Sequence, residues 1–200
     1  MKIKNRAIGL LTTMAVVLVL GSGVALAATT IHCPNDTSQG SPSSFLYCNG
    51  TSLADTMVGS ELADYMHGVG ANDTMHGYAG GDYLEGGKGS DHLYGDSGAE
   101  YGLWGGAYEG ATDTFPDNSD DYVHGGGGAD KIIGGQAQGG VDRLYGDAGN
   151  DYINASQRQS PNPAIAVTKE IIDCGAGASD EVYFDKGLDI VKNCETKYPY

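Results

Sequence analysis

Single apolar side chains recur in a polar, glycine-rich background along the middle of the chain, most of them nine residues apart. They are Met57, Met66, Met75, Leu84, Leu93, Val123, Ile132, Leu144 and Ile153. One apolar residue in nine cannot form a core by itself. Short strands stacked about 4.8 Å apart would align these side chains in columns, and such columns can form one.

An acidic residue lies two positions before most of these apolar side chains. The acids are Asp55, Asp64, Asp73, Asp82, Asp91 and Glu100, then Asp121, Asp130, Asp142 and Asp151. Each repeat divides into six residues rich in Gly, Asn and Asp, which favour turns, and three that suit a short strand with the middle one pointing inward.

Two nonapeptides per coil would give two facing sheets with turns at two edges. Asp73 would then stack on Asp55 and Asp91, and Asp82 on Asp64 and Glu100. The pattern predicts an all-β fold of stacked coils, a β-solenoid.

The amino-acid composition excludes several other classes of protein. The 200 residues include 33 Gly, a density that excludes a helical bundle, because Gly in a helix interior costs about 1 kcal/mol relative to Ala. Collagen is excluded because Gly lacks a strict period of three. The formal net charge of −15 argues against a nucleic-acid or anionic-membrane partner, since phosphate binding needs Lys and Arg.

Residues 1–27 have the three parts of a secretory signal peptide. These are the basic residues Lys2, Lys4 and Arg6, the apolar run 7–20 and the cleavage site Ala25-Leu26-Ala27. Cleavage would remove three basic and no acidic side chains and leave 173 residues with a net charge of −18 and no membrane span. An uncleaved N-terminal anchor is the alternative. We expect the protein to be secreted.

The four cysteines form two close pairs in the sequence, Cys33 with Cys48 and Cys174 with Cys194. Export to an oxidising compartment favours disulfides, and three connectivities are possible. We favour the two local ones, Cys33–Cys48 and Cys174–Cys194. Each would close a loop of about 15–20 residues and contribute on the order of 3 kcal/mol.

Stacked carboxylates repel one another unless they are protonated or a cation lies between them. Oxygen ligands from Asp side chains and turn carbonyls favour a hard cation, and Ca²⁺ tolerates irregular coordination by six to eight oxygens. Zn²⁺ would require Cys or His, and Mg²⁺ keeps several waters. The spacing therefore predicts several Ca²⁺ ions as the cofactor.

Three repeats are the most regular: Gly86-Gly-Lys-Gly-Ser-Asp91, Gly125-Gly-Gly-Gly-Ala-Asp130 and Gly146-Asp-Ala-Gly-Asn-Asp151. At these residues the chain resembles the RTX, or haemolysin-type, calcium-binding family, whose repeat is Gly-Gly-x-Gly-x-Asp-x-apolar-x. The resemblance implies a parallel β-roll of secreted bacterial proteins. It also implies metal ligation by Asp64, Asp73, Asp82, Asp91, Asp130, Asp142 and Asp151, with turn carbonyls near Gly86, Gly89, Gly125, Gly128, Gly146 and Gly149.

Several positions depart from this repeat. Thr-Ser-Leu-Ala precedes Asp55 and Ser-Glu-Leu-Ala precedes Asp64, so these turns lack the inner glycines and are candidates to cap the roll instead of binding metal. Glu100 replaces Asp and Gly102 occupies the apolar position, which predicts a broken column there. Residues 103–120 read as an excursion loop, and residues 136–138 as a second one.

The predicted organisation has five parts: a signal peptide (1–27), an N-terminal cap with a disulfide (28–49), the β-roll (50–154), a linker (155–165) and a C-terminal cap (166–200). The last part contains degenerate repeats ending at Asp180 and Asp189. It is either a disulfide-stapled β cap, which we favour, or a set of further metal-binding coils.

These parts use nearly the whole chain and leave no separate catalytic domain. We expect a secreted, non-enzymatic calcium-binding module, structural or interacting, that folds when Ca²⁺ binds. One alternative is a glycan-binding adhesin that uses Tyr65 and Tyr83, which we expect to stack. Another is a polysaccharide-modifying enzyme with its site on the roll or on the 103–120 loop. His67, His76 and His124 read as surface residues, with a transition-metal site as the alternative.

Overall fold

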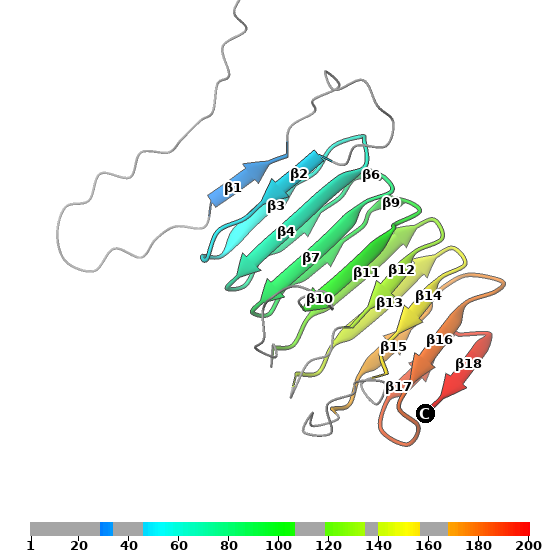
Figure 1. The fold of residues 1–200 in the computed structure, drawn as a ribbon. Coiled ribbons are helices and arrows are strands. Elements are labelled where there is room, and N and C mark those ends of the chain that lie inside the picture. Colours follow the sequence, from blue (N-terminus) through cyan, green and yellow to red (C-terminus); the bar gives the residue numbers. More distant parts are fainter. Residues whose placement is uncertain (1–28, 34–45, 107–118, 135–139, 157–167) are drawn as a thin grey trace, which may run out of the picture.

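The computed structural model describes residues 29–33, 46–106, 119–134, 140–156 and 168–200. These residues form two facing parallel β-sheets, and the chain winds back and forth between them as a solenoid (Figure 1). The prediction of an all-β parallel roll is confirmed. The described part of the chain contains no helix, and hence none suited to crossing a membrane. The predicted signal peptide lies outside the described residues.

The first sheet, sheet A, has ten strands, all paired in parallel. Its main path is β1 (Thr29–His32), β3 (Asp55–Val58), β5 (Thr74–His76), β8 (His92–Tyr94), β11 (Tyr122–Gly127), β13 (Arg143–Ala148), β15 (Ile171–Asp173) and β17 (Ile190–Lys192). Two further strands, β6 (Ala79–Gly80) and β9 (Ser97–Gly98), pair with each other, and β9 also pairs with β11.

The second sheet, sheet B, has eight strands. In chain order they are β2 (Leu46–Asn49), β4 (Asp64–Gly70), β7 (Tyr83–Lys88), β10 (Gly102–Gly106), β12 (Lys131–Ile133), β14 (Tyr152–Asn154), β16 (Glu181–Phe184) and β18 (Thr196–Pro199). Apart from the short strands β6 and β9, which follow β5 and β8 in sheet A, successive strands along the chain belong to alternate sheets, as two nonapeptides per coil require.

The core consists of two columns of apolar side chains, one from each sheet, and every member is fully buried. Sheet A contributes Met57, Met75, Leu93, Val123, Leu144 and Ile172; sheet B contributes Met66, Leu84, Leu103, Ile132, Ile153 and Val182. All nine apolar residues of the predicted columns are therefore confirmed. Burial of each such side chain contributes about 1.5–3 kcal/mol.

The expected break in the column after Glu100 does not occur, so that prediction is wrong. Gly102 aligns with Tyr83 instead, and Leu103 fills the apolar position between Leu84 and Ile132. The backbone N–H groups of Tyr101 and Gly102 both donate to the carbonyl of Asp82, at 2.9 and 3.3 Å. This is a one-residue bulge, in which the additional residue, Tyr101, lies exposed at the surface.

The excursion predicted to begin at residue 103 begins no earlier than residue 107, because residues 103–106 complete strand β10. The remainder of the predicted excursion, except residues 119 and 120, and the loop predicted at 136–138 lie outside the described residues. The segments 107–118, 135–139 and 157–167 share one topological position. Each joins a strand of sheet B to the next strand of sheet A.

Disulfides lie at both ends of the core. Cys33 directly follows β1 and bonds to Cys48 of β2, with Cα atoms 5.4 Å apart. Cys174 directly follows β15 and bonds to Cys194, with Cα atoms 5.1 Å apart. These are the local pairings that the sequence favours. The described parts of both predicted caps extend the two sheets, with β1 and β2 at one end and β15 to β18 at the other.

Candidate metal centre

The acidic residues form two ladders, one along each edge of the solenoid. Edge A, where the chain passes from sheet B to sheet A, carries Asp55, Asp73, Asp91, Asp121, Asp142, Glu170 and Asp189. Edge B, where it passes from sheet A to sheet B, carries Asp64, Asp82, Glu100, Asp130, Asp151, Asp180 and Glu195. From Asp55 onward, each strand on the main path of either sheet that the structure describes is therefore preceded, or begun, by one acid of a ladder.

One hydrogen bond repeats along each ladder. The backbone N–H of each acid donates to a carboxylate oxygen of the acid one coil further along. Asp55 N–H donates to Asp73 Oδ1 at 2.8 Å, and Asp73 N–H donates to Asp91 Oδ1 at 2.7 Å. On edge B, Asp64 N–H donates to Asp82 Oδ1 at 2.8 Å. The predicted stacking of these acids is confirmed.

The second carboxylate oxygen has a different environment. On edge B, a second oxygen of Asp82, Glu100, Asp130, Asp151 and Asp180 is buried and makes no hydrogen bond. A buried anionic oxygen without a partner is costly, because desolvation is not compensated. These oxygens therefore require either a proton or a cation.

The carboxyl groups are correspondingly weak acids as long as no cation compensates their charge. Burial raises the pKa of Asp82 to about 7 and that of Glu100 to about 8, with neighbouring carboxylates adding to the effect. Burial likewise raises the pKa of Asp130 to about 6 and that of Asp151 to about 7. The N–H donors act in the opposite direction but are too weak to prevent the rise.

A glycine five residues before the acid makes room for the second oxygen. A Cβ atom on Gly125 would lie 2.5 Å from Asp130 Oδ2 and 2.8 Å from the carbonyl oxygen of Gly146 in the next turn. A Cβ on Gly146 would lie 2.5 Å from Asp151 Oδ2 and 2.4 Å from the carbonyl oxygen of Cys174. A carboxylate oxygen of one turn and a carbonyl oxygen of the next thus converge where only glycine fits.

The first turn of each ladder differs, as the sequence suggests. The backbone N–H and the hydroxyl of Thr51 donate to Asp55 Oδ2 at 2.6 and 2.8 Å. The backbone N–H of Ser60 donates to Asp64 Oδ2 at 2.7 Å. The donors from Thr51 give Asp55 Oδ2 a partner that the later turns lack, which supports a capping role for Asp55. Asp64 differs, because its Oδ1 is still buried without a hydrogen bond, and it therefore keeps the unpartnered oxygen that the later acids share.

The structure divides the predicted ligands between the two edges. Asp73, Asp91 and Asp142 lie on edge A, and Asp64, Asp82, Asp130 and Asp151 on edge B. The ladders also contain acids that the sequence analysis did not select: Glu100, Asp121, Glu170, Asp180, Asp189 and Glu195. Glu100 lies nine residues after Asp91 and Asp121 nine before Asp130, so the repeat spacing does indicate these two. Glu170 and Glu195 do not follow the nine-residue spacing, and the sequence pattern therefore does not reveal them.

The donor set fits Ca²⁺. Among the residues that the structure describes, no three side chains of His, Cys, Asp or Glu gather at one point. A site must therefore combine carboxylates from the ladder with carbonyl oxygens of the turns. Such an all-oxygen set of six to eight ligands is typical of Ca²⁺, whereas Zn²⁺ would need nitrogen or sulfur ligands.

Fold and site together define a calcium-binding β-roll, a parallel solenoid with stacked acidic turns. Four copies of the RTX calcium-binding nonapeptide repeat match residues 49–84, 67–99, 117–139 and 136–157, so the resemblance is confirmed. Residues 49–157 thus carry repeats of the RTX family, and Ca²⁺ is the ion that such repeats bind. No curated protein and no solved structure matches the chain.

The outer faces of the sheets carry stacked rings. On sheet B, Tyr65 and Tyr83 stack with centroids 4.7 Å apart, as predicted, and Trp104 stacks on Tyr83 at 4.1 Å. On sheet A, Nδ1 of His76 lies 3.1 Å from Asp96 Oδ2, and Nδ1 of His124 lies 2.7 Å from Asp147 Oδ2. His67 belongs to sheet B, so it and His76 lie on opposite faces, as expected.

Proposed function

We propose that this protein is a secreted calcium-binding β-roll that serves as a structural or interaction module and completes its fold when Ca²⁺ binds outside the cell. The observation that carries the proposal is the row of buried carboxylate oxygens without hydrogen bonds along edge B. A cation supplies the missing partner of each oxygen and reduces the repulsion between stacked carboxylates.

The proposed ligands are the predicted set Asp64, Asp73, Asp82, Asp91, Asp130, Asp142 and Asp151, with Glu100 added by its place in the ladder. Carbonyl groups of the turns complete the sites. They lie near Gly86, Gly89, Gly125, Gly128, Gly146 and Gly149. The positive φ angles of Gly89 and Gly128, 116° and 144°, support this assignment, because they give the turns a course that other residues rarely follow.

Two features support secretion. The first is the signal-like segment 1–27 of the sequence. The second is the pair of disulfides, because disulfides form and persist in oxidising compartments. Extracellular modules bind Ca²⁺ with Kd values of about 10⁻⁴–10⁻³ M, so millimolar calcium would hold such a protein folded.

The ring geometry favours a structural role for Tyr65 over a glycan-binding one. Tyr47 and Tyr83 contact Tyr65 with centroids at 5.0 and 4.7 Å. Neighbouring rings thus occupy the surface against which a sugar would stack. Cross-strand aromatic pairs of this kind stabilise a sheet by about 0.2–1 kcal/mol each.

Calorimetric titration of the oxidised protein with Ca²⁺, followed by far-UV circular dichroism with and without chelator, tests the proposal. We expect saturable binding of several ions and a gain of β-structure at about 10 mM Ca²⁺, roughly ten times the weakest expected Kd. The same concentration of Mg²⁺ is the control and should have a much smaller effect, since Mg²⁺ dehydrates reluctantly. An unchanged spectrum and melting temperature between chelator and Ca²⁺ would contradict the proposal.

A further inference from the structure

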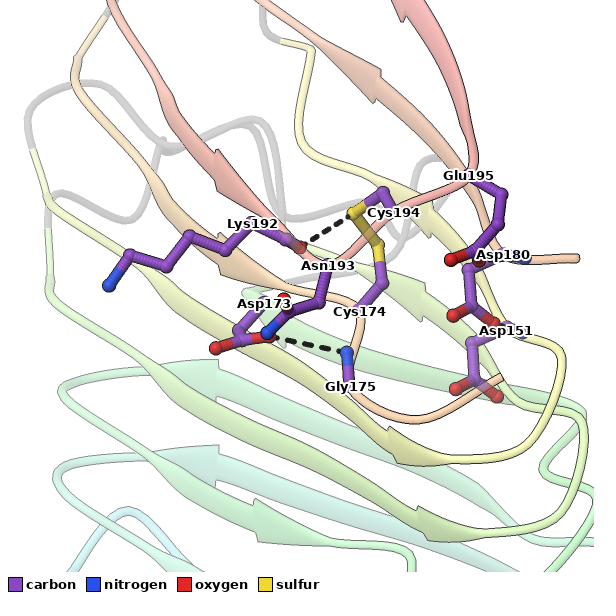
Figure 2. Close-up of a disulfide and its surroundings, with 9 residues drawn as sticks. All are labelled: Asp151, Asp173, Cys174, Gly175, Asp180, Lys192, Asn193, Cys194 and Glu195. Carbon is purple, nitrogen blue, oxygen red and sulfur yellow. Dashed lines mark hydrogen bonds between the residues drawn. A yellow bond between two sulfur atoms is a disulfide. The ribbon is translucent and has the colours of Figure 1, made fainter. Parts of the chain in front are cut away.

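The edge B ladder continues beyond the matched repeats, which end at residue 157. Asp151, Asp180 and Glu195 lie one above the other at this end of the solenoid (Figure 2). The backbone N–H of Asp151 donates to Asp180 Oδ1 at 2.8 Å, and the N–H of Asp180 donates to Glu195 Oε2 at 3.0 Å. The turn at residues 175–180 thus extends the stack that the central turns form.

Asp180, like the central acids, has a buried carboxylate oxygen that lacks a hydrogen-bond partner. It is fully buried, and its Oδ2 atom makes no hydrogen bond. A Cβ atom on Gly177 would lie 2.4 Å from Asp180 Oδ1 and 2.1 Å from the carbonyl oxygen of Gly149. A carboxylate and a carbonyl of the preceding turn therefore converge at a glycine here as well, but this glycine lies three residues before the acid instead of five. The nearest oxygen, Oδ1, is the one that accepts the N–H of Asp151, and the unpartnered Oδ2 lies 2.7 Å from the same point. The two turns are also joined directly, because Gly149 N–H donates to the carbonyl of Ala176 at 3.0 Å.

A disulfide joins the two segments that carry these acids. Cys174 immediately precedes the turn that ends at Asp180, and Cys194 immediately precedes Glu195 (Figure 2). Their bond thus joins the start of the turn to the segment that carries Glu195. Asp173 adds non-covalent links, because its Oδ1 accepts hydrogen bonds from Gly175 N–H at 3.2 Å and from Asn193 Nδ2 at 2.7 Å.

We propose that Asp180 and Glu195, with carbonyls of turns 146–151 and 175–180, form an additional Ca²⁺ site whose assembly requires the Cys174–Cys194 disulfide. The inference rests on the proposed function, since it assumes that the acidic turns hold Ca²⁺. It adds a dependence on redox state: the protein acquires its full number of ions only after it has left a reducing compartment.

The number of bound ions tests the site. The oxidised protein, purified from an exporting host, is titrated with Ca²⁺ by calorimetry as wild type, Asp180→Asn and Glu181→Gln. We expect Asp180→Asn to bind one ion fewer. Glu181→Gln removes the same charge at the next residue, whose side chain is not buried, and this variant should bind the wild-type number of ions. Glu195→Gln changes an exposed residue and should weaken the binding of one ion. This variant replaces Asp180→Asn in the test if Asp180→Asn does not fold.

A matched pair of double variants tests whether the site requires the disulfide. The double variant Cys174→Ser/Cys194→Ser should lose one ion, whereas Cys33→Ser/Cys48→Ser, which opens the disulfide at the other end, should keep the wild-type number. If all variants bind the wild-type number of ions, the additional site does not exist. If only Asp180→Asn loses an ion, the site exists but needs no disulfide, and that part of the inference is overturned. If wild type binds no Ca²⁺, the proposed function itself has failed.

Discussion

The backbone N–H of Asp82 donates to Oε2 of Glu100, one coil further along, at 2.7 Å. Glu100 in turn donates its own N–H to Asp130 Oδ1 at 3.0 Å. A glutamate therefore occupies a ladder position between two aspartates, and its carboxyl group lies among like charges. Burial is the main reason why the pKa of Glu100 rises to about 8, and the neighbouring carboxylates of Asp82 and Asp130 raise it further.

Glu100→Gln should have opposite effects with and without Ca²⁺. In metal-free protein at about pH 9, above the pKa of about 8, the neutral amide avoids a buried charge while its oxygen still accepts the N–H of Asp82. We expect a gain in the free energy of unfolding on the order of 1 kcal/mol, the scale of one pKa unit. In saturating Ca²⁺ the same variant should be less stable than wild type, because a ligand charge is lost.

Thermal unfolding of both proteins under the two conditions measures these effects. Glu61→Gln is the control, since Glu61 is exposed in the turn before Asp64 and should change neither value appreciably. Equal stability of wild type and Glu100→Gln at high pH in metal-free buffer would show that Glu100 is not buried as a charge.

The metal-free protein should lose stability as pH rises. The carboxyls of Asp82, Glu100 and Asp151 have folded-state pKa values of about 7, 8 and 7, well above their ordinary range. The folded state thus binds more protons than the unfolded state. The contribution is fully present below about pH 4 and is lost as pH rises through about 7 to 8.

Calcium should reverse this trend, because protons compete with the cation for the same carboxylates. Melting temperatures of metal-stripped and Ca²⁺-saturated protein at about pH 5, 7 and 9 decide the matter, since linkage fixes the sign of each slope. Parallel slopes in the two series would indicate that the titrating carboxyls are not the calcium ligands.

Val69→Gly should stabilise the protein. Val69 has a φ of 83°, a region that branched residues rarely adopt, and aligns with Gly87 of the next coil, whose φ is 99°. Relief of this strain should raise the free energy of unfolding by about 1 kcal/mol. Val58→Gly in strand β3 is the control and should lower it by about 0.5–1 kcal/mol or more, because its backbone is extended. Chemical denaturation measures both, and a destabilised Val69→Gly would refute the strain argument.

The regular part of the fold could be predicted because a solenoid converts sequence spacing directly into position. Residues eighteen apart occupy the same place on successive coils, as the pairing of Met57 with Met75 shows. A single inserted residue defeats this rule. The bulge at Tyr101 moves the apolar position from Gly102 to Leu103, and spacing alone does not show on which side of Glu100 the extra residue is absorbed.

The ladders were harder to predict than the columns. In the sequence, each of the segments 107–118, 135–139 and 157–167 comes between a strand of sheet B and the next strand of sheet A, so the eighteen-residue spacing of the edge A acids is lost after Asp91. Glu170 is recognised as a ladder member only through its hydrogen bonds to neighbouring coils. The assignment of acids to two separate edges likewise depends on which strands pair, a property of the fold and not of any single repeat.

Gly125→Ala should disrupt a calcium site that Gly127→Ala leaves intact. Both glycines belong to strand β11, but a Cβ on Gly125 would lie 2.5 Å from Asp130 Oδ2, whereas the nearest atom to a Cβ on Gly127 is 3.9 Å away. The added methyl group at residue 125 would occupy the place where the carboxylate and the Gly146 carbonyl converge. We expect a loss of about 1–3 kcal/mol from overpacking, and a reduced gain in melting temperature on adding Ca²⁺. Gly127→Ala should stay within about 0.5 kcal/mol of wild type. Thermal unfolding with and without Ca²⁺ measures both, and equal calcium-dependent stabilisation of the two variants would place the ion elsewhere.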